Sequence, residues 1–159
     1  MGKVLRFFNN GTPGAIARAL DDVVISMANR SGDMIPFGAP LALGGDRGGV
    51  VPFDPSAHAA EDFVGVSVRN PAKTPDTYGA DQGSYAPDDL VDVLVRGHIV
   101  VPMGNYSARV GDPVSIDRET GGFTVGSGNT VVPLDNVHIS GIPDIADVAE
   151  IVLNTRNII

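Results

Sequence analysis

The chain has 159 residues and a formal net charge of −8, because 19 Asp and Glu residues outnumber 11 Lys and Arg residues. A chain of this length is most simply one domain with a hydrophobic core of its own. An excess of negative charge opposes binding to phosphate backbones and to anionic lipid, so we expect no nucleic-acid or membrane partner. The chain contains no cysteine, which excludes disulfides, thiolate catalysis and cysteine-based zinc sites.

The composition is rich in residues that end or turn regular structure, with 20 glycines and 12 prolines. Such a composition favours many short strands joined by turns over long helices. No apolar run approaches the roughly 20 residues that a membrane-spanning helix needs. The first residues lack the apolar core and cleavage site of a signal peptide, and we expect a protein made in a reducing cytoplasm.

Residues 1–15 combine apolar side chains with a run of turn-forming residues, and we expect them to form an arm. Leu5, Phe7 and Phe8 are its candidate contact residues. Apolar residues this close to a terminus need a surface to pack on, and for proteins in general that surface is more often their own domain. The alternative is the surface of another subunit, and the sequence leaves both open.

The next segment, residues 16–31, carries two conflicting patterns. Its apolar residues fall at helical spacing from Ile16 to Met27, and Thr12 and Pro13 suit a helix cap and first turn. The β-branched run 23–25 instead favours an extended backbone. The local rules favour a helix, so an extended segment here needs support from elsewhere.

Residues 32–159 have turn signals every eight to twelve residues, which is typical of a sandwich or barrel. We expect Val64, Val66 and Val68 to line one face of a half-buried strand, and Gly97 to bend the chain between two adjacent strands. The expected strands cover residues 34–43, 50–53, 63–69, 90–95, 99–101, 114–117, 123–125, 131–134, 137–140 and 149–153.

The longest stretch without a strand pattern is residues 70–87, which we expect to be an exposed loop. Tyr78 and Tyr85 lie within it, and tyrosine offers a large contact area at low entropic cost. Both residues are therefore candidate interface anchors. The equally weighted alternative is that they pack back onto the rim of their own domain.

No pattern for catalysis or metal binding stands out. His58, His98 and His138 are the only histidines, and none has the spacing of a zinc motif. The glycine-rich loop 44–49 lacks the lysine and hydroxyl of a phosphate-binding loop. Most carboxylates fall at turn positions, where capping explains them. We therefore expect no cofactor, no metal and no enzymatic activity.

Several turn-and-strand motifs occur in an order that resembles the structural cement, or head decoration, proteins of tailed bacteriophages. The similarity covers residues 13–153, apart from the loop 70–87. The motifs that carry it are Pro13–Arg18, Asp21–Ser26, Ile35–Leu41, Glu61–Val68, Val110–Asp117, Thr120–Thr124 and Ala149–Leu153.

The resemblance implies a non-enzymatic protein that binds the outside of an assembled capsid at junctions between capsomers and holds the shell against internal DNA pressure. Its partners would be the major capsid protein and copies of itself, commonly in a trimer and sometimes in a dimer. The implied fold is mainly β, a small β-barrel or jelly-roll-like sandwich of short antiparallel strands with an extended N-terminal arm. Residues 1–31 would then be an arm leading into the first strand, and residues 32–159 one β domain.

This interpretation agrees with the residues in physical terms. An acidic surface favours solubility before assembly, and weak contacts repeated on a lattice gain from avidity. The candidate partner-binding residues are Leu5, Phe7, Phe8, Ile16, Arg18, Tyr78 and Tyr85. The alternative is a small oligomeric β-barrel that binds a ligand or catalyses a reaction between subunits. It predicts a polar pocket lined by residues such as Asp46, Asp112 or His98.

Overall fold

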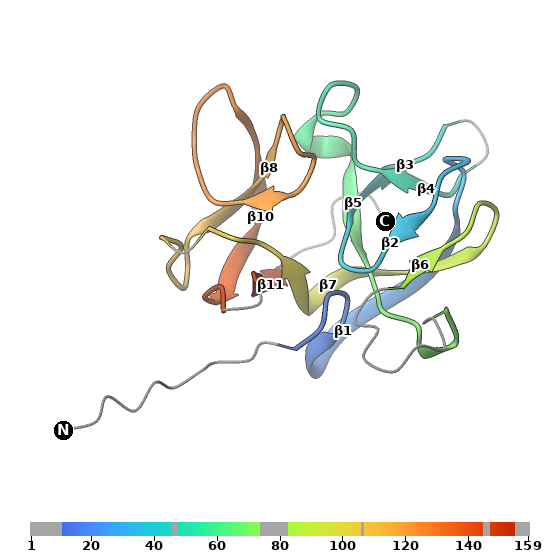
Figure 1. Cartoon of the computed structure of the whole chain (residues 1–159), viewed down its shortest axis with the longest axis horizontal. Helices are drawn as coiled ribbons and strands as arrows, with labels where there is room; N and C mark the ends of the chain where they lie inside the picture. Colours follow the sequence, from blue (N-terminus) through green and yellow to red (C-terminus); the bar gives the residue numbers. More distant parts are fainter. Residues whose placement is uncertain (1–10, 46–47, 74–82, 106, 145–146, 155–159) are drawn as a thin grey trace.

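The computed structural model describes residues 11–45, 48–73, 83–105, 107–144 and 147–154, and strand β7 (Leu90–Pro102) is its central element (Figure 1). Three strands pair with β7, all antiparallel: β1 (Ile16–Ala28), β5 (Phe63–Ser67) and β11 (Val148–Leu153). β5 pairs with the first half of β7 and β11 with the second half, while β1 pairs along both. Every other part of the main sheet is reached through these neighbours.

The main sheet has the strand order β4-β3-β5-β7-β11-β10-β8-β9, with β1 as a further partner of β7. Its remaining strands are β3 (Pro40–Leu43), β4 (Val50–Pro52), β8 (Pro113–Asp117), β9 (Phe123–Thr124) and β10 (Val131–Gly141). Strands β2 (Ile35–Pro36) and β6 (Ser84–Tyr85) form a separate two-stranded ladder. The end of β1 meets β4 through a bridge between Asn29 and Val50, which curls this side of the sheet into a half-barrel.

The expectation of a mainly β, antiparallel fold is confirmed. The only helices among the described residues are two 3-10 turns, η1 (Ala60–Asp62) and η2 (Pro71–Lys73). Within that part of the chain, no helix has the length and apolar character needed to cross a bilayer. The expected strands on either side of the glycine-rich loop 44–49 pair as a hairpin, because Leu43 of β3 pairs with Val50 of β4.

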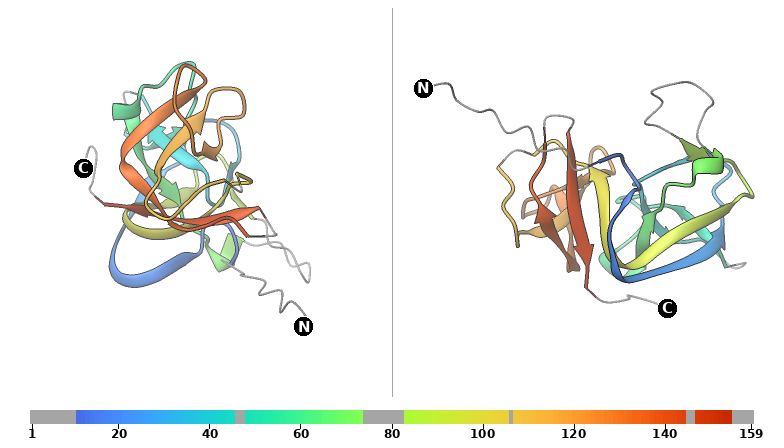
Figure 2. Two further views of the ribbon diagram at one scale, coloured as in Figure 1. Left: turned by 90° about the vertical axis from the view of Figure 1, so that its left-hand side faces the viewer. Right: turned by 90° about the horizontal axis from the view of Figure 1, so that it is seen from below.

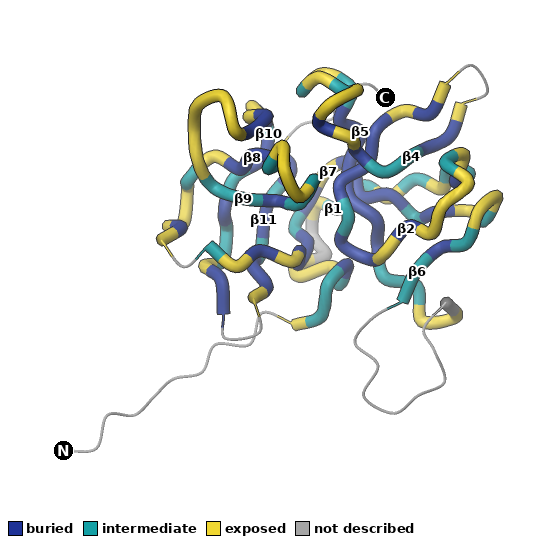
Figure 3. The backbone as a smooth tube through the Cα atoms, turned by 45° about the horizontal axis from the view of Figure 1, so that its top comes forward, coloured by how far each residue is buried: buried dark blue, intermediate teal, exposed yellow. Residues whose placement is uncertain are grey.

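The sheet encloses two hydrophobic cores. In the right-hand view of Figure 2 the ribbon divides into two halves, with β8, β10 and β11 in one half and the first strands of the chain in the other. Figure 3 shows the buried backbone running through both halves. The first core consists of Ala42, Phe53, Phe63, Val66, Val68, Leu94, Ile99, Val101, Met103, Ala108, Val114, Ile116, Phe123, Val132, Leu134, Val137, Ile139, Ala149, Ile151 and Leu153. The second core consists of Ile35, Phe37, Leu41, Val50, Val64, Tyr85, Val91, Val93 and Val95.

β7 is one continuous strand, so the prediction of two strands on either side of Gly97 is wrong. Gly97 has a φ of 123°, a backbone conformation that residues with a side chain rarely adopt. The Asp22 carboxylate also occupies the place where a β-carbon of residue 97 would lie. The odd-numbered residues Val91, Val93 and Val95 face the second core before this point, whereas Ile99 and Val101 face the first core after it. Gly97 therefore turns the strand over without ending it.

β10 is likewise continuous where two strands, 131–134 and 137–140, were predicted. Its first part pairs with β8 and its later part with β11, with a register shift against β8 between Pro133 and His138. The polar residues Asp135 and Asn136 therefore mark a change of partner, since both flanks of the strand still find hydrogen-bonding neighbours.

Residues 16–28 form a strand, so the extended interpretation is correct for this segment and the helical spacing is misleading. The stretch Val24–Ala28 pairs regularly with Leu90–Leu94, and Ile25 and Met27 pack against the second core. The register shifts three times between Ile16 and Val24, and the largest gap, between Arg18 and Val23, is where β1 bulges away from β7. The free edge of β7 supplies backbone partners that outweigh a marginal local helix preference.

β5 is buried along its whole length, so the prediction of a half-buried strand is wrong. Val64 belongs to the second core, whereas Val66 and Val68 belong to the first. The pairing with β3 explains this, because Leu41 faces Gly65 while Ala42 faces Phe63. Val64 is the extra residue of a β-bulge, and such a bulge redirects side chains to the opposite face.

Tyr85 closes the second core and is fully buried. Its hydroxyl donates a 2.6 Å hydrogen bond to the carbonyl oxygen of Val68, and its ring meets Phe37 edge-on at a centroid distance of 5.4 Å. Burial raises the pKa of Tyr85 to about 12, and the negative charge of Asp92 also favours the neutral phenol. The tyrosinate form is therefore incompatible with this packing.

Replacing Gly65 by alanine should destabilise the fold by about 1–3 kcal/mol, because a β-carbon there would overlap the backbone oxygen of Leu94. Gly126→Ala is the matched control, since its β-carbon would have only Val131 Cγ1 within reach, at 3.9 Å. Urea unfolding of both variants measures the difference. Equal stabilities would contradict the close approach of β5 to β7.

Tyr85→Phe should cost about 1 kcal/mol near neutral pH, because the carbonyl of Val68 loses its hydrogen-bond donor. The pKa of Tyr85 is about 12 in the folded chain, above the usual value of about 10 in an unfolded one. The tyrosine therefore stabilises the fold fully below about pH 10, and this contribution is lost as pH rises through about 12. Unfolding measured between these limits should show a shallower decline for the phenylalanine variant, and identical slopes would contradict the assignment.

Candidate functional site

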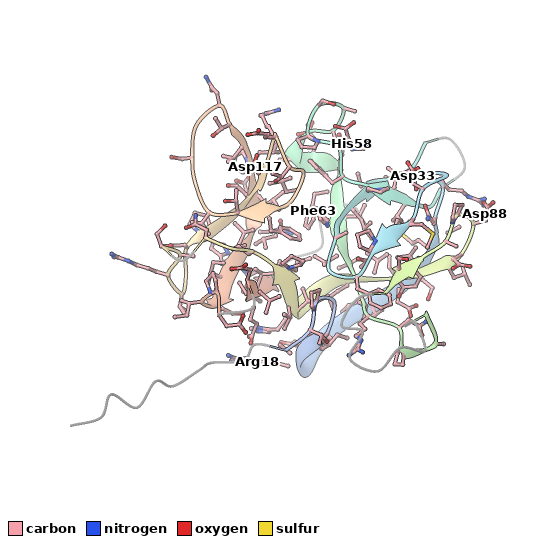
Figure 4. All side chains as sticks on the ribbon, in the orientation of Figure 1. Arg18, Asp33, His58, Phe63, Asp88 and Asp117 are labelled. Atoms are coloured by element: carbon pink, nitrogen blue, oxygen red, sulfur yellow. The ribbon has the colours of Figure 1, made fainter. Side chains whose placement is uncertain are left out.

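The most polar group of side chains sits where β1 bulges away from β7. Glu150 Oε1 lies 3.0 Å from Arg18 Nε, 3.2 Å from His98 Nδ1 and 2.9 Å from the Ser140 hydroxyl, which donates to it. These four residues, the polar cluster, come from β1, β7, β10 and β11. Arg18 is labelled in Figure 4 at the start of β1, and its side chain is 62% exposed, whereas that of Glu150 is 14% exposed.

The polar cluster contains a serine, a histidine and a carboxylate but lacks the geometry of a nucleophilic triad. In a triad the serine hydroxyl bonds to one imidazole nitrogen and the acid to the other. Here Ser140 and Glu150 both face His98 Nδ1, at 3.3 and 3.2 Å, and the Ser140 hydroxyl donates to Glu150. The serine proton is thus directed at the carboxylate, so the histidine does not act as its base. The arrangement joins strands and activates no nucleophile.

A small cavity of about 150 Å³ adjoins His98 on the same side of the sheet. It lies below the range of about 300–1,000 Å³ typical of small-molecule sites. Its lining residues are Asp21, Arg96, Gly97, His98, Val152, Leu153 and Asn154. The ion pair between Arg96 and Asp21 measures 3.6 Å between two largely exposed side chains, and such pairs contribute little energy.

The structure does not gather the residues expected around a polar pocket. His98 lines the small cavity, but Asp112 sits in the turn before β8, where it accepts the backbone N–H of Arg109 at 2.8 Å. Asp46 lies outside the described residues. Of the two expected pocket residues that the structure describes, only His98 lines a cavity.

The histidines occupy separate structural positions. His58 Nδ1 accepts the N–H of Asp54 at 2.9 Å, and His138 Nδ1 lies 2.9 Å from the side-chain amide of Asn154. Ser56 donates hydrogen bonds to Asp54 from its hydroxyl and its N–H, and these lower the pKa of that carboxyl. Among the described residues there is no group of three or more histidine, cysteine or acidic side chains able to hold a metal ion.

The candidate partner-binding residues divide into three groups. Ile16 and Arg18 lie on β1 with 38% of the residue and 62% of the side chain exposed, respectively, so both are accessible to a partner. Tyr85 is buried in its own domain, which is the second of the two arrangements considered for it, and its side chain offers no surface for contact. Leu5, Phe7, Phe8 and Tyr78 lie outside the described residues.

An apolar groove on the surface was not anticipated from the sequence. This apolar groove has a volume of about 220 Å³ and lies between the β2–β3 segment, the end of β7 and the turn joining β8 to β9. Its lining residues are Pro36, Phe37, Gly38, Ala39, Pro40, Pro102, Thr120, Gly121, Gly122 and Phe123. The prolines and glycines of these segments indicate only turns in the sequence. The three segments come together only in the tertiary fold.

The fold and these surfaces define a rigid β domain suited to contact with other proteins. The family model described as "Structural cement protein (E217 gp24/Pam3 gp6)" matches residues 3–154, and the chain belongs to this family. It is a structural component of a phage capsid, and its role is non-enzymatic. The resemblance seen in the sequence is thereby confirmed, and the enzyme alternative is set aside.

A solved structure supports the fold. A chain of the structure described as "The capsid of Myoviridae Phage XM1" is similar with a TM-score of 0.71 and 20% sequence identity, over 96% of this chain and 95% of that chain. A sequence identity of 20% shows similarity of the fold alone. No curated protein matches the chain.

Glu150→Gln should lower stability by about 1 kcal/mol, because it removes the charge that faces Arg18 and His98 while solvent screens much of the pair. Glu61→Gln, at an exposed position of η1, serves as the control and should leave stability unchanged. Urea unfolding distinguishes the two. A Glu150 variant as stable as the parent would contradict a structural role for the polar cluster.

Proposed function

We propose that the protein binds the outer surface of an assembled phage head at junctions between capsomers and stabilises the shell against internal pressure. The observation that carries the proposal is the family match, which extends over residues 3–154. The surface and the packing of the described residues support this proposal. They form a rigid sheet around two cores, with exposed strand and groove surfaces and no metal-binding group.

We further propose that the protein acts as a homo-oligomer, with a trimer favoured over a dimer. A lattice of identical capsomer junctions repeats each contact many times, so individually weak contacts add up through avidity. The net charge of −8 favours solubility of the free protein before it meets the head.

The contacts are assigned to the arm and the exposed start of β1. Leu5, Phe7 and Phe8 supply apolar area, and Ile16 and Arg18 extend this surface onto the domain. Tyr78 remains a proposed anchor in the loop 70–87. In this view residues 1–31 comprise the arm and the first strand, and residues 32–159 the rest of the β domain.

Purified protein should sediment as one oligomer and co-sediment with expanded empty heads at a fixed stoichiometry, raising their melting temperature. These results would support the cement role and count the copies per capsomer. A stable oligomer that ignores heads, under conditions where the heads remain intact, would refute the proposal.

Deletion of residues 1–10 should weaken binding to heads about tenfold or more, because the apolar contacts of the arm are lost. The deletion retains Thr12, whose hydroxyl accepts a hydrogen bond from Arg69 at 3.1 Å and whose carbonyl accepts the N–H of Ala15 at 3.0 Å. The shortened chain should therefore unfold in urea like the parent. Full occupancy of heads by the deletion variant would refute the arm contacts alone.

A further inference from the structure

The apolar groove is a surface without charge. Thr120 is the only lining residue with a polar side chain, and Phe37 and Phe123 beneath it are only 3% and 6% exposed. Asp117, labelled in Figure 4, begins the turn that forms one wall, and the strands β2 and β3 flank the opposite wall. The groove is thus an opening onto the hydrophobic interior of the domain.

The backbone of the groove offers almost no hydrogen bonds to an occupant. Pro36, Pro40 and Pro102 have no N–H group. The N–H groups of Phe37, Gly38 and Ala39 donate to Gly83 O, Ser67 O and Ser67 Oγ, at 3.1, 2.9 and 2.9 Å. On the other wall, the N–H groups of Gly121 and Gly122 donate to Asp117 O and Thr120 Oγ1. An anion or an added β-strand would find none of these N–H groups free, so the groove suits an apolar side chain.

The size of the groove points the same way. A volume of about 220 Å³ is smaller than a typical cofactor or metabolite site but ample for one large side chain. Water held against such a wall has few hydrogen-bond partners, so an apolar group that displaces it gains free energy. An aromatic residue offers the largest gain per residue ordered.

The sequence outside the described residues contains a matching segment. Phe7 and Phe8 lie in residues 1–10, next to the basic residues Lys3 and Arg6. The turn beside the groove exposes the carboxylate of Glu119, while Arg118 donates to Pro55 O at 3.0 Å. A basic aromatic segment therefore complements both the apolar groove and the acidic residue beside it.

The position of residues 11–15 favours a segment from another copy. Pro13 and Gly14 already pack against Gly38 at one end of the groove, with Pro13 Cβ 3.2 Å from where a Gly38 β-carbon would lie. A β-carbon placed on Gly11 would lie 3.8 Å from Val100 Cγ2. Because Pro13 and Gly14 of the chain itself already pack at this end of the groove, we favour a segment from a neighbouring copy as the occupant of the rest.

We propose that the apolar groove receives the Phe7–Phe8 segment of a second copy of this chain. The inference rests on the homo-oligomer of the proposed function and names the contact that holds it together. One phenylalanine fills the groove, and Lys3 or Arg6 faces Glu119.

Cross-linking tests the contact directly, because the chain has no cysteine of its own. Asn9→Cys, which keeps both phenylalanines, is mixed with a second preparation carrying Thr120→Cys at the exposed rim of the groove. Mild oxidation should join the two different chains, and Ser127→Cys in place of Thr120→Cys should not cross-link, since this exposed residue does not line the groove. Cross-linking no greater than with Ser127→Cys would overturn the proposal. So would an Asn9→Cys/Thr120→Cys double variant that closes its disulfide within one chain.

Filling the groove gives a second test. Gly122→Leu adds a side chain whose β-carbon lies 3.5 Å from Thr120 Oγ1, an ordinary contact, so the fold tolerates it. Gly126→Leu is the control outside the groove. The Gly122 variant should lose at least about tenfold in cross-linking yield, and the Gly126 variant should keep it. Undiminished cross-linking by Gly122→Leu would overturn the proposal.

Binding to heads is measured separately on the parent chain. If heads are saturated while the cross-link is absent, the groove contact fails and the cement role stands. If the parent chain ignores heads, the proposed function fails, and the cross-link then reports on self-association alone.

Discussion

A single strand that must bury side chains in two different cores constrains the whole molecule. β7 has neighbours on both edges, so its backbone hydrogen bonds are satisfied only within the complete sheet. Its odd-numbered side chains up to Val95 pack in the second core, whereas Leu94 and the odd-numbered side chains from Ile99 pack in the first core. The exchange needs one residue with a positive φ, and Gly97 provides it. The strand β7 therefore joins the two halves of the molecule through both cores, which suits a protein whose role is structural.

The polar cluster follows from the same constraint. Where β7 turns over, β1 leaves its regular pairing, and backbone groups are exposed that need partners. The carboxylate of Asp22 accepts the N–H of His98 at 3.3 Å, while Glu150 links His98, Ser140 and Arg18. Polar side chains thus stabilise a junction between strands. Serine, histidine and glutamate, which also occur in catalytic sites, here stabilise the place where the pairing of β1 with β7 is irregular.

The contacts that we propose use the outward surface of the domain. The apolar groove combines three segments that are far apart in the chain, and every N–H group named in its walls is already used inside the domain. Such a surface rejects charged and hydrogen-bonding ligands and accepts apolar side chains. Recognition by a structural protein on a lattice needs little more than this, because repetition multiplies each contact.

The sequence by itself determined the class of fold and the absence of chemistry. Frequent turn residues and β-branched runs fixed a mainly β chain, the lack of cysteine and of metal-binding spacing removed most enzymatic options, and the ordered motifs carried the family. Only the tertiary structure decided which face each strand buries, because that depends on register. The bulge at Val64 shifts the alternation of β5 by one residue, and the odd-numbered side chains of β7 pass from the second core to the first across Gly97. No local pattern in the sequence reveals either change. The groove and the burial of Tyr85 were decided in the same way, since both depend on contacts between segments distant in sequence.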